Sequence, residues 1–156
     1  DATVGNLQSQ NASIGGTADI SGDATLESDL EVQGDATTQG VTTQNGALVH
    51  DITDISHSDG SNYNVTASDY MMFNTWGGGG DNGTGTITLP LATNNEGRLL
   101  RFKSDDTISA NKTAVLVPSG SDTIDGASSY TMDRPYDGIM IVAHNDRWFI
   151  VQRKEK

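Results

Sequence analysis

The sequence predicts an all-β protein: a trimeric, triple-stranded β-helical shaft followed by an antiparallel, jelly-roll-like β-sandwich. Residues 12–47 follow a six-residue repeat, and the rest of the chain contains short apolar segments separated by turn-forming residues. No segment shows convincing helical periodicity. We therefore expect residues 1–50 to form the shaft and residues 51–156 to form the sandwich.

The repeat is clearest in its apolar and glycine columns. From Ala12 the hexads read ASIGGT, ADISGD, ATLESD, LEVQGD, ATTQGV and TTQNGA. A period of two places the first and third positions on one face of a strand, and Gly at the fifth position turns the chain. The predicted shaft core is Ala12, Ala18, Ala24 and Leu30 from the first column, with Ile14, Ile20, Leu26 and Val32 from the third.

Two architectures satisfy this repeat, because no hexad can bury its apolar face alone. One is a single-chain left-handed β-helix with three hexads in each coil. The other is a triple-stranded β-helix wound from three identical chains. Six hexads make only about two single-chain coils, which is too small a core to stand alone. We favour the trimer.

Seven short strands are expected in the second part of the chain, and their number and spacing are typical of an antiparallel sandwich. Segments such as Gly-Ser-Asp and Asn-Asp separate them, and residues 144–147 read as a hairpin turn. The expected strands are residues 63–67, 70–74, 86–91, 98–103, 114–118, 138–143 and 148–152.

Composition and charge exclude several classes of function. The chain has 156 residues and no cysteine, so disulfides, thiol chemistry and Cys-based zinc sites are excluded. No apolar run approaches the roughly 18–20 residues that cross a bilayer, so we expect no membrane insertion. The chain has neither a visible signal peptide nor an initiator Met, so we expect it to be a fragment or a processed product.

The charge is distributed unevenly around a net value of −12. Residues 1–97 carry thirteen acids and no base, whereas residues 98–156 carry eight acids and nine bases. An acidic first part argues against a nucleic-acid partner, because binding a phosphate backbone requires Lys and Arg. We interpret the acids as a solvated, self-repelling surface, with binding of a divalent cation as the alternative.

A glycine-rich segment is the candidate receptor contact. It lacks the Gly-Lys-Ser/Thr ending of a phosphate loop, so we interpret it as an exposed recognition loop. Trp76 at its edge is either a core residue, which we favour, or a ring that stacks on a sugar. The segment consists of Trp76, Gly77, Gly78, Gly79, Gly80, Asp81 and Asn82.

Other polar residues give weaker signals. We interpret Asp122 and Asp125 as turn-capping residues and not as the paired acids of a hydrolase. His50 is a weak metal candidate, because one inward His per chain would supply three ligands around a threefold axis. The segments at Asp59 and at Asp105-Asp106 offer oxygen ligands without matching an EF-hand. We predict no catalytic residue and no cofactor, and a bound divalent cation is the alternative.

The order of the motifs resembles a known family. A Thr-Leu-Pro strand (residues 88–90), an Asp-Thr-Ile-Asp-Gly turn (residues 122–126) and a closing Trp-x-Ile strand (residues 148–150) resemble a C-terminal module of bacteriophage tail-fibre, tail-needle and head-fibre proteins. The shaft hexads resemble the Val-x-Gly-Asp-Ala-Thr repeats of similar fibres. Arg147 departs from the Gly that often precedes the Trp in that family.

This resemblance implies a homotrimeric structural protein of a virion. The implied partners are other virion proteins at the N-terminal side and a glycan or protein of the host surface, which the fibre would contact in a multivalent way. The alternatives are a head fibre without a defined receptor, a tip enzyme that degrades surface polysaccharide, and a fragment of a bacterial adhesin.

Overall fold

A computed structural model of the chain describes residues 31–33, 36–39, 42–43, 45, 47–77 and 82–154. The chain divides into two units, Asp1–Asn45 and Gly46–Lys156, and every strand described below belongs to the second unit. Val32 is 48% exposed in the single chain. The other predicted shaft core residues, from Ala12 to Leu30, lie outside the described residues, so the shaft stays a prediction.

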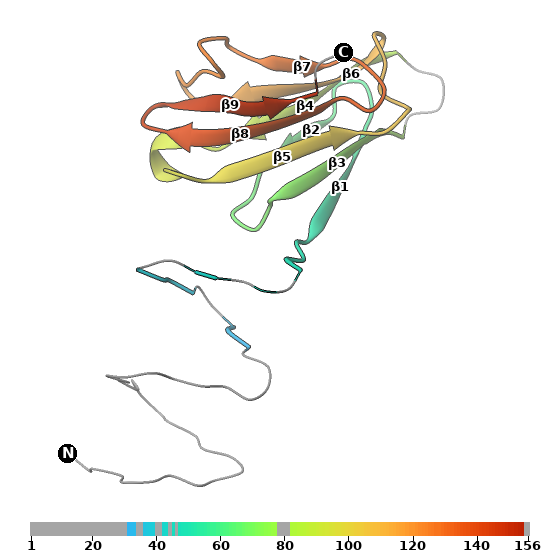
Figure 1. Ribbon diagram of the computed structural model, residues 1–156. Coiled ribbons are helices and arrows are strands. Elements are labelled where there is room, and N and C mark those ends of the chain that lie inside the picture. The colour runs from blue at the N-terminus through green and yellow to red at the C-terminus, as the bar shows by residue number, and fades with distance from the viewer. Residues whose placement is uncertain are drawn as a thin grey trace, which may run out of the picture. The chain divides into compact units, whose positions relative to one another are not determined.

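The described residues form nine strands and one 3-10 turn, with no α-helix, so the chain is all-β as predicted (Figure 1). All seven expected segments overlap strands, whereas β1 and β7 were not expected. The strands are β1 Ile52–His57, β2 Asn62–Asn64, β3 Met71–Trp76, β4 Gly83–Leu89, β5 Leu99–Ser104, β6 Lys112–Pro118, β7 Tyr130–Met132, β8 Gly138–His144 and β9 Arg147–Arg153. The 3-10 turn η1 spans Ala92–Asn94.

The strands form two sheets, and the prediction that they are antiparallel is wrong. The five-stranded sheet has the order β1-β3-β5-β8-β9, and the four-stranded sheet has the order β2-β4-β6-β7. From β1 to β6 the chain alternates between the sheets, so it returns to each sheet in the same direction. The pairs β1–β3, β3–β5, β2–β4 and β4–β6 are therefore parallel, and only the later pairs are antiparallel. A strand in the opposite sheet serves as the crossover that parallel pairing requires.

The core receives alternate residues from both sheets. In β3, β5 and β8 every second side chain is buried, as the two-residue period of a strand requires. Met72, Phe102 and Ile141 of the five-stranded sheet belong to the same hydrophobic cluster as Ile87 and Leu116 of the four-stranded sheet. Burial of such side chains is the main favourable term in folding.

The residues that carry the family resemblance meet around Trp148, which is fully buried. Its indole Nε1 donates a hydrogen bond to the carbonyl of Pro90 at 3.2 Å. Its backbone amide donates to Thr123 at 2.8 Å, and its carbonyl accepts from Asp125 at 2.9 Å. The three motifs therefore meet at one structural junction. The predicted hairpin is also confirmed, because His144 pairs with Arg147 across the turn.

Candidate functional site

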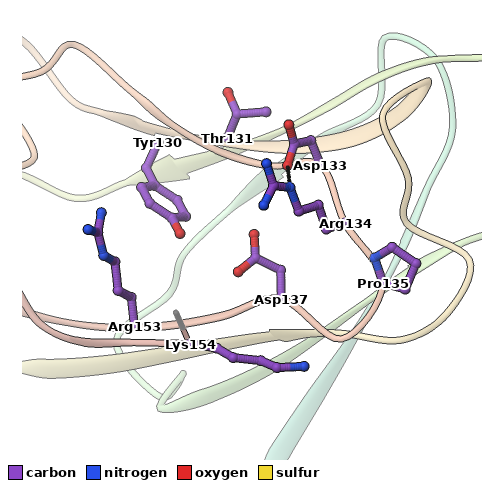
Figure 2. A pocket seen from close by; sticks show the side chains of 8 residues that line it. All are labelled: Tyr130, Thr131, Asp133, Arg134, Pro135, Asp137, Arg153 and Lys154. Carbon is purple, nitrogen blue, oxygen red and sulfur yellow. Dashed lines mark ion pairs between the residues drawn. The ribbon is translucent and has the colours of Figure 1, made fainter. Parts of the chain in front are cut away.

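A charged pocket of about 450 Å³ lies between the connection from β7 to β8 and the end of β9 (Figure 2). Figure 2 shows the Tyr130 ring, the Arg134 guanidinium and the Asp137 carboxylate around the middle of this pocket. The complete lining is Tyr130, Thr131, Asp133, Arg134, Pro135, Asp137, Arg153 and Lys154. We call this site the β7–β8 pocket.

Packing and hydrogen bonds hold the walls of the β7–β8 pocket in place. Met132 is fully buried, and Tyr130, two residues earlier on β7, packs partly buried against the core. The connection after β7 is attached to the end of β5, because the hydroxyl of Ser104 donates to the carbonyl of Arg134 at 3.1 Å and to that of Asp137 at 3.3 Å. The pocket is therefore preformed, as most ligand sites are.

The β7–β8 pocket is locally basic on an acidic chain. Among the described residues, three of the nine bases line it against two acids, so their formal charge is +1 while the chain carries −12. Asp133 and Arg134 form an ion pair at 3.4 Å. Burial and the charge of Lys154 lower the pKa of the neighbouring Lys103, and Asp137 opposes this shift. Burial, followed by the charge of Asp137, raises the pKa of Tyr130. The pocket can thus offer both donors and acceptors beside an aromatic ring.

Sequence reasoning missed this pocket. Its first wall is the run Asp133-Arg134-Pro135-Tyr136-Asp137, which combines turn-formers with charges of both signs between two strands. This mixture of turn-formers and charges was the sequence feature that could have indicated a binding pocket. The second wall, Arg153 and Lys154, lies sixteen or more residues further on and is brought close only by the pairing of β8 with β9.

The predicted contact loop is described only at its two ends. Gly77 and Asn82 are exposed, and residues 78–81 lie outside the described residues. Trp76 is 6% exposed, and its buried indole Nε1 has no hydrogen-bond partner among the described residues. This burial agrees with the core alternative and leaves the ring face unavailable for stacking on a sugar.

Asp122 and Asp125 accept hydrogen bonds from backbone amides that are distant in the sequence, and not from amides of the turn that the sequence indicated they would cap. Asp122 Oδ2 accepts a hydrogen bond from the amide of Ala92 at 2.7 Å, and Asp125 Oδ1 accepts one from the amide of Ile150 at 3.1 Å. Asp125 and Gly126 have φ values of 48° and 83°, in the left-handed region that turns use. Both carboxylates are therefore occupied by backbone amides.

The candidate metal ligands are dispersed. The exposed His50 ring stacks on Tyr70, with 3.9 Å between ring centroids and an interplanar angle of 30°. Asp59 accepts from the amide of Thr84, which is distant in the sequence, and Asp105 accepts from the nearby amide of Thr107, so both carboxylates bind backbone amides. Within the described residues no three His, Cys, Asp or Glu side chains gather as metal ligands would.

No protein-family model matches the chain, and no curated protein matches it. Within the part of the chain that the structure describes, no helix is long and apolar enough to cross a membrane. The resemblance to phage fibres therefore rests on the quoted motifs and stays a prediction.

Proposed function

We propose that this chain is part of a trimeric, non-enzymatic fibre on a bacteriophage virion, which attaches to the host surface at several points at once. The observation that carries the proposal is the repeat at residues 12–47. Its apolar columns require burial, and six hexads from one chain supply too little core. Three chains wound together would supply three times as many apolar side chains along one axis.

The β7–β8 pocket is the proposed host contact of this fibre. Its half-buried tyrosine ring offers an apolar surface, and its arginines and aspartates can hydrogen-bond hydroxyl and carboxylate groups. These features suit an acidic sugar of a bacterial surface. A trimer would present three such pockets, so weak individual affinities would combine into avidity. The loop at residues 77–82 remains a second proposed contact.

Binding is a better match to this pocket than hydrolysis. Glycosidases place two carboxyl groups on either side of the bond that they cleave. Here Asp133 is already paired with the adjacent Arg134, and Asp137 Oδ1 accepts a hydrogen bond from the amide of Gly138 at 2.8 Å. The pocket thus favours a binder over a polysaccharide-degrading tip enzyme.

The molecular mass in solution tests the proposal. Light scattering on the full chain should give three times the 16.5 kDa mass of one chain. A mass of one chain across the concentration range used would overturn the fibre proposal, because the repeat would then have to fold without partners.

A further inference from the structure

The outer face of the five-stranded sheet is unusually apolar. Because Met72, Leu100, Phe102, Ile139 and Ile141 point into the core, the residues between them point outward. The apolar outward residues are Met71, Phe73, Leu99, Met140, Val142 and Phe149. At the free edge of the same face, Ile52 of β1 is 60% exposed.

The four-stranded sheet provides an internal comparison. Its outward positions are mostly polar: Asn62 and Asn64 on β2, Thr84, Thr86 and Thr88 on β4, and Thr131 on β7. Val115 and Val117 of β6 are the apolar exceptions. The outer face of the five-stranded sheet is therefore the more apolar of the two, although Asp54, Arg101 and Lys103 also point outward on it. Parallel strands such as β1, β3 and β5 typically have both faces covered.

The apolar face also contains a hollow with a basic rim. The hollow measures about 290 Å³, and its lining includes Met71, Met140, Arg101 and Lys103. Met71 pairs with Arg101, and Arg101 pairs with Met140, so these outward side chains are neighbours across three strands. Among the residues that the structure describes, no acid lines this hollow. Its occupant should therefore be apolar at the centre and acidic around it.

The same chain carries a segment with that chemistry. On β1 the exposed Ile52 has exposed acids at Asp51 and Asp54. Ile52 and Asp54 share the outward face, because Ile55 and His57 are buried. In one chain Ile52 pairs with Met71, so this edge adjoins the hollow on the β3 side, and the hollow extends across β5 to Met140 on β8.

We infer that the outer face of the five-stranded sheet is the surface through which copies of this chain associate, with the Ile52 edge of one copy seated in the basic-rimmed hollow of the next. This inference rests on the proposed trimer and identifies the surface that would form it. Because the two complementary patches are different, the contact is head to tail. Such contacts form a ring when repeating the rotation between neighbouring copies brings the last copy back to the first. Apolar burial and charge complementarity would act together in this interface.

A pair of cysteines tests the inference in the full chain, which has no cysteine of its own. In the variant Ile52→Cys with Met140→Cys, the two thiols of one copy lie three strand spacings apart, roughly 14 Å. Disulfides need Cα atoms within about 7 Å, so a bond between these positions must join two copies. The matched control is Asn64→Cys with Thr131→Cys, which are also three strands apart on the outer face of the four-stranded sheet.

Mild oxidation should convert the first variant into covalent dimers and trimers on a denaturing gel, while the control variant stays monomeric on that gel. A chain that is trimeric by mass but forms no disulfide in the first variant would overturn the interface and leave the fibre proposal standing. Equal cross-linking of both variants would also overturn it, because random collision would then explain the result. A monomeric mass for the unmodified chain would instead overturn the fibre proposal and, with it, this inference.

A single-cysteine measurement covers the case in which the double variant does not assemble. Leu99→Cys lies on the apolar face, where Leu99 is 38% exposed in one chain, and Thr86→Cys lies on the outer face of the four-stranded sheet. A bulky maleimide should label Leu99→Cys at least tenfold more slowly than Thr86→Cys. Labelling of Leu99→Cys as fast as the control would contradict a covered face.

Discussion

Asp69 joins three segments of the chain through its carboxylate, and the substitution Asp69→Asn isolates the contribution of its charge. Oδ1 accepts a hydrogen bond from the Thr53 hydroxyl at 2.7 Å. Oδ2 accepts three more, from the Tyr63 hydroxyl at 2.8 Å, the Thr66 amide at 2.7 Å and the Thr66 hydroxyl at 2.9 Å. Asn preserves the shape of the side chain, but it removes the charge and replaces one acceptor oxygen with a donor.

The expected loss of stability follows from these four bonds. A hydrogen bond to a charged group contributes about 1.5–3 kcal/mol, and one between neutral groups contributes about 0.5–1.5 kcal/mol. The loss is partly offset because a neutral amide costs less to bury than a carboxylate. We therefore expect Asp69→Asn to lower the free energy of unfolding by about 2–4 kcal/mol near neutral pH.

The pH dependence of this loss has a defined sign. Burial raises the pKa of Asp69, but the hydrogen bonds from Thr53, Thr66 and Tyr63 outweigh it, so the pKa is lowered overall. A lowered pKa contributes stability above the unfolded-state value of about 3.9 and loses it as the pH falls through the folded-state value. The difference between the wild type and Asp69→Asn should therefore shrink below about pH 4.

Urea denaturation followed by tryptophan fluorescence measures both effects, at one chain concentration for every variant. Asp106→Asn is the control, because Asp106 is an exposed acid of the same domain. The control should stay within about 0.5 kcal/mol of the wild type. A loss below about 0.5 kcal/mol for Asp69→Asn at pH 7 would refute the reasoning, as would a loss that persists undiminished at pH 3.

Four further predictions concern the core and the pocket. Gly85→Ala should lower the free energy of unfolding by about 1–3 kcal/mol through overpacking, because the new Cβ would lie 2.2 Å from Nδ1 of the buried His57. In the same unfolding assay Gly138→Ala should be almost neutral, because the nearest atom to its new Cβ lies at 3.5 Å. Trp148→Phe should lower the free energy of unfolding by about 1–3 kcal/mol, since it removes the hydrogen-bond donor to the Pro90 carbonyl and leaves a void. An unchanged urea midpoint would contradict the junction around Trp148. Burial lowers the pKa of His57, and the hydrogen bond that its Nε2 donates to Asn74 Oδ1 opposes this shift. An NMR titration should therefore give His57 a lower pKa in the folded chain than in the unfolded chain, and protonation of the unfolded chain should reduce stability as the pH falls below about 6.5. Arg134→Ala should weaken binding to acidic glycans on an array by at least tenfold. Arg147→Ala, at a similarly exposed arginine outside the pocket, should leave binding unchanged. Equal binding by both variants would show that the pocket does not bind these glycans.

Strand identity was largely readable from the sequence. Segments such as Gly138–His144 are short and mostly apolar, and turn-formers such as Asn145-Asp146 separate them from the next strand. β1 escaped detection because its six residues include only two large apolar side chains. β7 escaped because it has three residues, too few to display a period.

Sheet pairing was not readable in the same way. The period of two decides which side chains of β3 face inward, but it is the same for parallel and antiparallel neighbours. Nothing local to residues 71–76 specifies that β1 and β5 lie beside them. The prediction of antiparallel pairing failed for this reason, since it assumed that consecutive strands are neighbours.

The sequence by itself determined the all-β class and the closing hairpin, because each depends on residues close together in the chain. Only the tertiary structure decided the alternation between two sheets, the burial of Trp76 and the assembly of the β7–β8 pocket from residues 130–137 and 153–154. These features depend on contacts between residues that are distant in the sequence. The same contacts distinguish the apolar outer face from the polar one, because side chains on five strands form a surface only after the strands have paired.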